Sequence, residues 1–234
     1  MSAVLELDHV SRVYGSGAAA VKALDDVSLT VDDGAFVAVM GASGSGKSTL
    51  LGIAGGLDQA TSGTVSMLGE PLAGRSRDDL ARLRRQSLGF VFQDFNLVPT
   101  LTAVENIALP LELDGVNAKQ ARVQALAALE RVGLPELADR FIEQMSGGQR
   151  QRIAIARAIV GERRLVLADE PTGALDSHTG DGIMALLRQL ADEGIAVILV
   201  THEARHAGWA DRVVFLCDGS IIDESRRLGD PSEL

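Results

Sequence analysis

Two kinds of hydrophobic pattern alternate along the chain. Short runs that are wholly apolar, or that alternate apolar with polar residues, predict β-strands, because successive side chains of a strand point to opposite faces. Such runs lie at residues 4–10, 27–31, 36–40, 88–92, 165–168, 195–200, 213–217 and 220–222. Stretches with helical spacing lie between several of them. This order predicts an α/β fold whose mainly parallel sheet is covered on both faces.

The middle of the chain has a different pattern. Residues 102–140 have helical spacing without a strand-like run, and residues 118–132 are rich in alanine. We expect Pro110, Gly133 and Pro135 to separate the helical pieces, because proline and glycine disfavour helix interiors. The sequence therefore predicts a helical insertion that begins near Gln93 and ends near Met145.

Composition narrows the classes of function. The 234 residues are 46% hydrophobic and 23% charged, as in globular proteins, and the net charge is −10. That charge disfavours broad binding of nucleic acid, so we expect no nucleic-acid partner. The single cysteine, Cys217, excludes an intramolecular disulfide. No apolar run reaches the ~20 residues of a membrane span, and the N-terminus is expected to be a strand and not a signal peptide.

The strongest local motif is G-x-x-x-x-G-K-S at residues 41–48. It lies between a predicted buried strand and a predicted helix, which is the context in which backbone N–H groups and a helix N-terminus bind phosphate. A plain glycine-rich turn is the alternative interpretation. In this motif Lys47 is expected to reach the terminal phosphates and Ser48 to hold Mg²⁺. The predicted nucleotide-binding residues here are Gly41, Ser43, Gly44, Ser45, Gly46, Lys47, Ser48 and Thr49.

Two further segments carry candidate chemistry. The apolar run at 165–168 ends in Asp169 and Glu170. A carboxylate at a strand end can hold magnesium, and a second one can polarise an attacking water; an acidic strand end without such a role is the alternative. Ser146, Gly147, Gly148 and Gln149 precede an Arg-rich helical stretch, which predicts either an anion-binding helix N-terminus or an ordinary N-cap.

These motifs together resemble the ATP-binding subunit of ABC transporters over essentially the whole chain. The resemblance assigns residues 41–48 to the P-loop, residues 146–149 to the signature motif and residues 165–169 to the Walker B segment. It also matches Tyr14 to the adenine-stacking aromatic, Gln93 to the Q-loop glutamine, Asp176 to the D-loop and His202 to the switch histidine. Met145, Ala42 and Glu203 depart from the usual leucine, proline and aspartate.

The resemblance implies a P-loop NTPase core with a mainly parallel central sheet, an N-terminal antiparallel β-subdomain and an inserted α-helical subdomain at about residues 94–160. Residues 1–234 would form one nucleotide-binding domain that binds ATP and Mg²⁺. Lys47, Glu170 and His202 would be catalytic, while Ser48, Gln93 and Asp169 would hold the metal. Residues 146–149 would act in trans within a homodimer that forms on ATP binding.

A narrower resemblance concerns the segments 89–99, 102–106 and 109–111, which look like the subgroup that releases lipoproteins or exports macrolides and antimicrobial peptides. This implies an integral-membrane permease with a large extracytoplasmic domain as partner. The chain would then be cytoplasmic and peripheral on the inner face of the cell membrane. The alternative is a soluble single-domain ABC ATPase without a permease, such as an iron–sulfur assembly ATPase. A purely structural protein would need a dead site, which the intact motifs disfavour.

Overall fold

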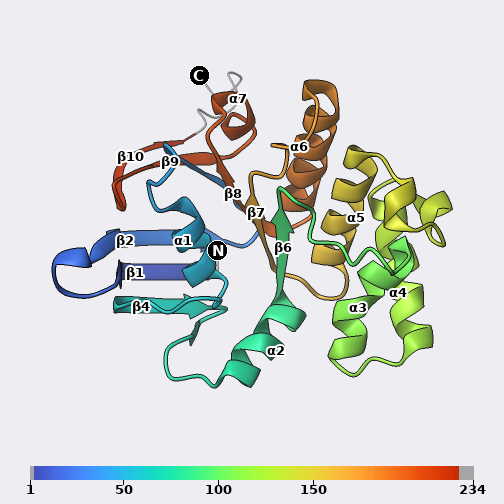
Figure 1. Ribbon diagram of the computed structural model, residues 1–234, viewed down its shortest axis with the longest axis horizontal. Helices are drawn as coiled ribbons and strands as arrows, with labels where there is room; N and C mark the ends of the chain where they lie inside the picture. Colours follow the sequence, from blue (N-terminus) through green and yellow to red (C-terminus); the bar gives the residue numbers. More distant parts are fainter. Residues whose placement is uncertain (1–2, 227–234) are drawn as a thin grey trace. The chain divides into compact units, whose positions relative to one another are not determined.

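The computed structural model describes residues 3–226, so the two ends of the expected single domain lie outside the described part. The chain divides into two compact units. The first comprises Met1–Arg75 and Leu190–Leu234, and the second comprises Ser76–Gln189. Figure 1 labels the elements of both units, which are described in turn.

The first unit begins with an antiparallel sheet. Its strands β1 (Ala3–Tyr14), β2 (Val21–Asp32), β4 (Ser62–Met67) and β5 (Glu70–Pro71) run in the order β2-β1-β4-β5, and a 3-10 turn, η1 (Gly17–Ala19), joins β1 to β2. In Figure 1 the blue strands β1 and β2 lie side by side with β4. This sheet is the expected N-terminal β-subdomain. Its first two strands are longer than predicted because pairing continues through several register shifts.

A second sheet of this unit is mainly parallel. Strand β3 (Phe36–Met40) pairs in parallel with β8 (Ala196–Thr201) on one side and with β9 (Arg212–Cys217) on the other. Strand β10 (Ser220–Arg226) returns antiparallel to β9 through a turn at Asp218 and Gly219, both of which have positive φ. All six residues of β8 are buried, which explains its continuous apolar sequence.

Two helices complete the first unit. Helix α1 (Lys47–Ala54) follows β3, as predicted, and buries an apolar face that includes Leu50 and Ile53. The short helix α7 (Ala204–Ala207) follows β8. The chain thus alternates strand and helix as the hydrophobic pattern predicts.

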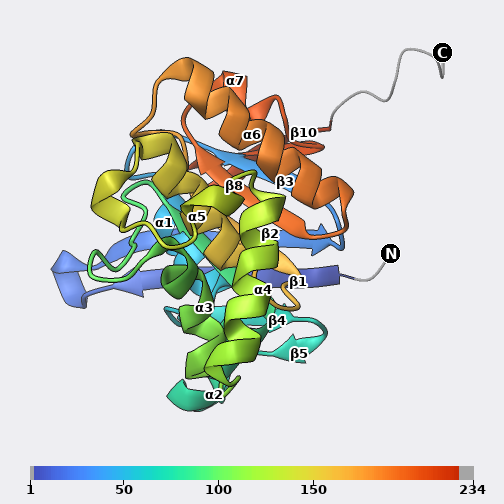
Figure 2. The ribbon, with the colours of Figure 1, turned by 90° about the vertical axis from the view of Figure 1, so that its right-hand side faces the viewer.

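The second unit contains two parallel strands and most of the helices. Strand β6 (Leu88–Phe92) pairs with β7 (Leu165–Asp169). The helices are α2 (Arg77–Ser87), α3 (Ala103–Leu113), α4 (Ala118–Arg131), α5 (Gly147–Ile159) and α6 (Ser177–Asp192), with 3-10 turns η2 (Pro135–Leu137) and η3 (Ile142–Gln144). Helices α3, α4 and α5 pack on one another, and Figure 2 shows α3 beside α4. The expected α/β fold with an inserted helical part is confirmed.

One predicted helix boundary is wrong. Pro110 lies inside α3 and does not end it, although proline removes one backbone hydrogen bond. The helix continues because its N-terminus is held by a capping box, in which Thr102 N–H donates to Glu105 Oε2 at 2.8 Å. The buried residues of α3 include Ile107 and Leu111. Tertiary packing thus outweighs the local preference of proline.

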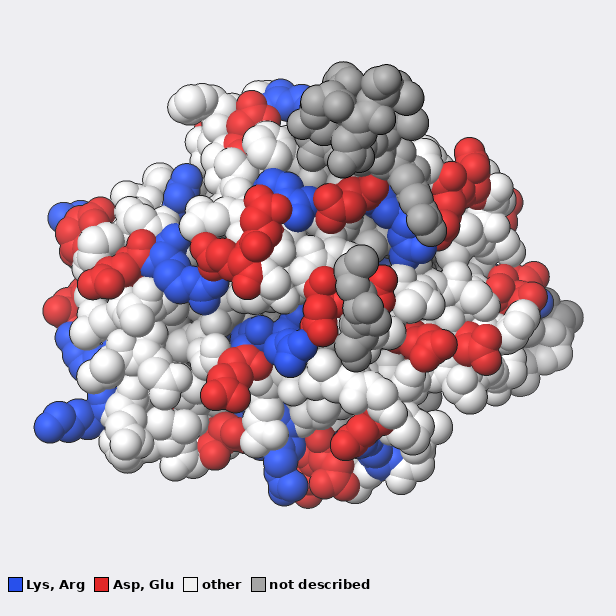
Figure 3. Space-filling model, turned by 180° about the vertical axis from the view of Figure 1, so that it is seen from behind, with Lys and Arg blue, Asp and Glu red and all other residues white. Residues whose placement is uncertain are grey.

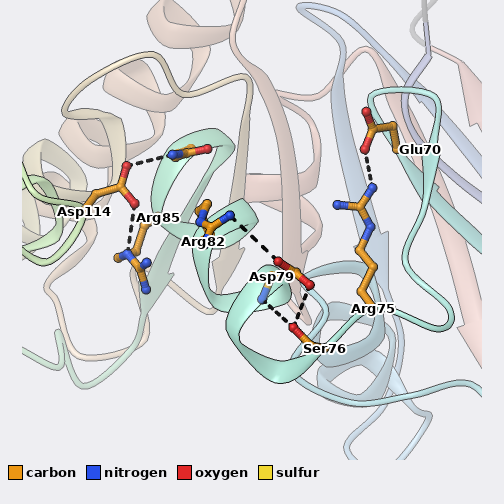
Figure 4. Close-up of polar contacts among 8 residues, drawn as sticks. Glu70, Arg75, Ser76, Asp79, Arg82, Arg85 and Asp114 are labelled. Carbon is orange, nitrogen blue, oxygen red and sulfur yellow. Dashed lines mark hydrogen bonds and ion pairs between the residues drawn. The ribbon is translucent and has the colours of Figure 1, made fainter.

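Polar side chains fix both ends of α2 (Figure 4). At its start, the Ser76 Oγ accepts from the Asp79 N–H at 3.1 Å and donates to the Asp79 carboxylate at 2.6 Å. Near its end, Arg85 and Gln86 donate to Asp114, the residue that follows α3, at 3.3 and 2.8 Å. These bonds tie the end of α2 to the end of α3.

Charges on the surface are mixed in sign. Acidic and basic side chains lie interspersed on the face that Figure 3 shows. Ion pairs include Arg122 with Asp139 at 2.8 Å and Arg212 with Glu224 at 2.9 Å. Exposed pairs of this kind add little to stability, so the buried apolar residues carry the fold. Among the described residues, no helix is both long enough and apolar enough to cross a membrane.

Candidate functional site

In the first unit, two predicted site residues leave the same edge of the parallel sheet. Met40 at the end of β3 pairs with Thr201 at the end of β8. Gly41 and His202 come directly after these residues, so the loop at residues 41–48 and the exposed His202 begin beside each other. The carboxyl edge of a parallel sheet is where α/β proteins bind ligands. The register therefore brings the two predictions together.

The loop at residues 41–48 wraps around a buried ammonium group. Lys47 is 9% exposed, and its Nζ donates to the carbonyl oxygens of Gly41 and Ala42, both at 2.7 Å. Gly46 caps α1 with φ +105°, and a Cβ placed on it would lie 2.3 Å from the carbonyl oxygen of Ala23. Only glycine fits this position. The loop is therefore tightly packed around Lys47 and leads directly into the N-terminus of α1.

Ser45 supplies the test of whether this loop fits a phosphate. Its side chain is 4% exposed, and its Oγ is buried without a hydrogen-bond partner in the described part of the chain. A buried hydroxyl without a partner is costly. It suits a site in which a ligand oxygen accepts its hydrogen bond, next to a lysine cation and a helix N-terminus. The loop thus fits an anion such as a nucleotide phosphate.

Tyr14 is fixed by two charged neighbours. Its hydroxyl donates to Asp58 Oδ2 at 2.6 Å, and the Arg12 guanidinium lies 4.4 Å from the ring centroid. Arg12 also pairs with Asp58 at 2.8 Å. Burial tends to raise the pKa of Asp58, but its bonds to Tyr14, Gln59 and Arg12 outweigh burial and lower it.

This arrangement suits the predicted stacking role of Tyr14. The side chain is 40% exposed, and the residue pairs with Val21, two positions before the Ala23 that contacts Gly46. Tyr14 therefore lies on β1, opposite the start of β2, the strand that borders the loop at residues 41–48. Arg12 covers one part of the ring, and the exposed remainder is available to a planar base.

The second unit has a matching arrangement at its own strand edge. Phe92 at the end of β6 pairs with Asp169 at the end of β7. Gln93 and Glu170 follow directly, so both leave the same edge. A Cβ on Gly173 would lie 2.9 Å from the Gln93 Cδ, which shows that the Gln93 side chain lies over Gly173. Three predicted residues, Gln93, Asp169 and Glu170, are thus neighbours.

Glu170 has an unusual backbone. Its φ is +46°, a left-handed conformation that costs a residue with a side chain ~1–3 kcal/mol and often marks functional positions. Pro171 follows it, and the Gly173 N–H donates to the Glu170 carbonyl at 3.0 Å. The loop therefore holds the Glu170 backbone in a strained conformation at a cost in free energy.

The glycines of residues 146–149 begin helix α5. Ser146 is its N-cap, and Ser146 and Gln149 form a capping box with bonds of 2.9 and 3.3 Å. A Cβ on Gly148 would lie 2.4 Å from the Thr179 Cγ2. Asp176 in turn accepts from the backbone N–H and the hydroxyl of Thr179 at 3.0 and 2.6 Å, which lowers the pKa of Asp176. The predicted signature and D-loop residues are therefore linked through Thr179.

Sequence inspection missed several residues that support the site. Arg12 and Asp58 hold Tyr14, while Gln151 and Arg157 of α5 bind backbone carbonyls of neighbouring loops. The sequence could have revealed Gln151, because it is a polar residue on the apolar face of a predicted helix. Asp58 carried none that spacing could show.

Comparison with known proteins identifies the family. The family described as ABC transporter matches residues 24–173, more than half of the chain. The chain belongs to the ABC transporter family. This cassette is 46% identical over 222 residues to "Macrolide export ATP-binding/permease protein MacB" of Shigella flexneri and to its counterpart in Escherichia coli K12. The match covers 95% of this chain and 34% of the relative, so the chain spans about a third of the length of these relatives.

Solved structures of other cassettes are similar to this one. The dimeric ATP-binding cassette MJ0796, solved in a post-hydrolysis state bound to ADP and Pi, matches with a TM-score of 0.87 and 41% identity, over 97% of this chain and all of that one. The structure of cbiO1 from Clostridium perfringens, part of the ABC transporter complex cbiONQ, matches with a TM-score of 0.86 and 28% identity over 97% of this chain and 89% of that chain.

The cassette is thus an ABC ATPase, a family whose substrate is ATP and whose cofactor is Mg²⁺. The predicted metal ligands fit that ion chemically. Ser48, Gln93 and Asp169 offer a hydroxyl, an amide and a carboxylate oxygen, and Mg²⁺ prefers oxygen ligands, few of them from protein. Within residues 3–226, no group of three or more His, Cys, Asp or Glu residues forms a metal cluster.

Proposed function

We propose that this cassette binds and hydrolyses Mg-ATP as a nucleotide-sandwich homodimer and powers a membrane permease of the macrolide-export or lipoprotein-release type. The observation that carries the proposal is the loop at residues 41–48, where the buried Lys47 and the unpartnered Ser45 hydroxyl stand at the N-terminus of α1. Such a loop binds phosphate groups of a nucleotide.

In the first unit we assign binding and orientation of the nucleotide. Tyr14 stacks on the adenine, while the backbone N–H groups of residues 41–49 and the ammonium of Lys47 bind the phosphates. His202 leaves the sheet beside this loop and donates to the γ-phosphate. Lys47 and His202 together stabilise the negative charge that develops on the phosphoryl oxygens.

In the second unit we assign the activation of water and the second set of phosphate contacts. Glu170 accepts a proton from the attacking water, and its strained backbone holds the carboxylate in position. By the family resemblance, Gln93 and Asp169 of this unit would be ligands of Mg²⁺, as would Ser48 of the first unit. Bound Mg²⁺ neutralises charge on the phosphates. Residues 146–149 of one copy contact the γ-phosphate bound by the other copy, with Asp176 beside them.

A permease is the partner that this proposal requires. The relatives from Shigella flexneri and Escherichia coli carry ATP-binding and permease in one name, and the cassette matches about a third of their length. This favours a permease-coupled cassette over a soluble ABC ATPase. The partner would have a large extracytoplasmic domain, and residues 1–234 would act as one nucleotide-binding domain on the inner face of the membrane.

Replacing Glu170 tests the proposal. Glu170→Gln keeps the shape of the side chain and removes its basicity, so we expect turnover to fall ~10²–10⁴-fold while ATP binding persists. Size-exclusion chromatography with Mg-ATP should then show a stable dimer of the variant. Glu162→Gln, at an exposed acid after α5, is the matched control and should hydrolyse ATP normally. A folded Glu170→Gln protein with the kcat of the wild type would contradict the assignment.

A further inference from the structure

One buried polar side chain of helix α5 is not explained by the proposed chemistry. Gln151 is 0% exposed and lies two positions after the signature residue Gln149. Its neighbours on the buried face of α5 include Ile155 and Ala158. An apolar side chain is the usual occupant of such a position.

Gln151 bonds to two loops at once. Its Nε2 donates to the Pro171 carbonyl at 2.6 Å and to the Phe92 carbonyl at 3.3 Å. Because both partners are carbonyl oxygens, only the amide N–H₂ of Gln151 can face them. One side chain therefore connects helix α5 with the end of β6 and with the loop that follows β7.

The two carbonyls flank the residues to which we assign hydrolysis. Phe92 directly precedes Gln93, and Pro171 directly follows Glu170. Glu170 is held in its left-handed conformation by the surrounding loop. Such strain persists only where neighbouring contacts over-determine the backbone. Releasing the Pro171 carbonyl would let this backbone relax and turn the Glu170 carboxylate away.

The other atom of the amide shows that packing alone does not explain Gln151. Its Oε1 is buried without a hydrogen-bond partner among the described residues. A buried acceptor without a partner is destabilising, and an apolar residue of the same size would avoid that cost. The amide is therefore at this position for what its N–H₂ group holds.

We propose that Gln151 is a positioning residue for ATP hydrolysis, which ties the backbones of Gln93 and Glu170 to the start of the signature helix. This proposal rests on the proposed function of Glu170. Gln151 lies in the second unit, whereas Lys47 and the phosphate loop lie in the first. Loss of the tie should therefore lower kcat and leave the affinity for ATP nearly unchanged.

Gln151→Met is the sharpest test, because methionine has about the length and volume of glutamine and removes the amide, that is, the donor N–H₂ together with the unpartnered Oε1. The full chain is purified, and the concentration of competent sites is measured by titration with a fluorescent ATP analogue. We expect kcat per competent site to fall ~10- to 100-fold, as small misplacements of catalytic groups do. We expect the dissociation constant for the analogue to change less than threefold. Gln151→Leu should give the same pattern.

Ile155→Val is the matched control. It shortens another buried side chain of α5 that bonds to neither loop, so it lowers stability without releasing Pro171. Its kcat per competent site should equal that of the wild type. Equal kcat per site for Gln151→Met and the wild type would overturn the proposal, as would a parallel loss of kcat and ATP affinity. Glu170→Gln separates this proposal from the proposed function of Glu170. If Gln151→Met keeps the kcat of the wild type while Glu170→Gln is inactive, the positioning role of Gln151 is wrong and the role of Glu170 stands.

Discussion

The phosphate loop and the Glu170 loop leave two pairs of parallel strands in the same way, yet they are held by different means. In the first unit, backbone groups and glycines fix residues 41–48, and Lys47 donates to two carbonyls of its own loop. In the second unit, side chains from other elements fix the loop, with Gln151 on Pro171 and Thr179 on Asp176. The first loop is held mainly by backbone groups, which include the Ala23 carbonyl packed against Gly46 and the Gly219 N–H that donates to the Ser45 carbonyl. The second loop is held by side chains of other elements.

This difference has a functional meaning. A loop built from backbone atoms presents the same N–H groups whatever its neighbours do, which suits the binding of an invariant phosphate. A loop held by side chains changes when the elements that carry those side chains move. The residues assigned to hydrolysis are thus held where a shift of α5 or α6 can reach them.

Among changes in the nucleotide-binding residues of the first unit, the largest effect should come from Lys47→Ala. The change removes the buried cation of the phosphate loop, and we expect ATP affinity and turnover both to fall, turnover by ~10²–10³-fold. Isothermal titration with Mg-ATP and steady-state hydrolysis measure the two. Lys22→Ala, at an exposed lysine of the same unit, is the control and should be silent. Loss of turnover with unchanged affinity for ATP would contradict the assignment of nucleotide binding to the loop at residues 41–48.

A single methyl group tests how rigid the phosphate loop is. Gly46→Ala places a Cβ 2.3 Å from a backbone oxygen at φ +105°, whereas Gly44→Ala has φ +83° with nothing within 4 Å. We expect at least tenfold weaker ATP binding for Gly46→Ala, beyond the ~1–3 kcal/mol of left-handed strain that both variants share. Fluorescent-nucleotide titration compares them. Equal losses would mean that strain, and not close packing, defines the loop.

Tyr14 tests a contact of the first unit that does depend on side chains. Tyr14→Ala should weaken ATP binding by about tenfold, since stacking on a base is worth ~1–3 kcal/mol. Tyr14→Phe keeps the ring and its contact with Arg12 but loses the bond to Asp58, so a smaller loss is expected. If Phe and Ala reduce affinity equally, the hydroxyl and not stacking carries the effect.

The smallest effect concerns pH. The pKa of Asp176 is lowered by hydrogen bonds from the Thr179 hydroxyl and amide. The charged form therefore stabilises the fold fully above the ordinary pKa of 3.8, and this contribution is lost as pH falls through the lower pKa of the folded state. Urea unfolding from pH 6 to 3 should show wild type and Asp176→Asn converging at low pH. Parallel curves would contradict this assignment.

How far the sequence predicts each region follows from the same contrast. The phosphate loop is predictable because its motif, the preceding strand and the following helix are contiguous, and the structure has β3 at the predicted bounds. Gln151 and Asp58 act on residues 20 and 44 positions away, which no local pattern records. The prediction that Pro110 ends a helix was wrong for the same reason, because burial of α3 decides whether the helix continues.

The lengths of the first two strands also could not be predicted from the local sequence pattern. Residues 4–10 and 27–31 alternate clearly, but β1 and β2 run to twelve residues each because cross-strand pairing carries them through register shifts. Assignment of the site residues needed only their order along the chain. The residues that hold them in place could be identified only from the fold.

Tyr14 has a spectroscopic consequence as well. It is the single tyrosine of the chain, and its hydroxyl is bonded to Asp58 while Arg12 lies over its ring. Ring-selective isotope labelling therefore gives one set of aromatic NMR signals, free of overlap, at the position expected to meet the adenine. The ring-current shift on adding ATP, compared with that on adding inorganic triphosphate, reports whether a base arrives at the ring, without any label attached to the nucleotide.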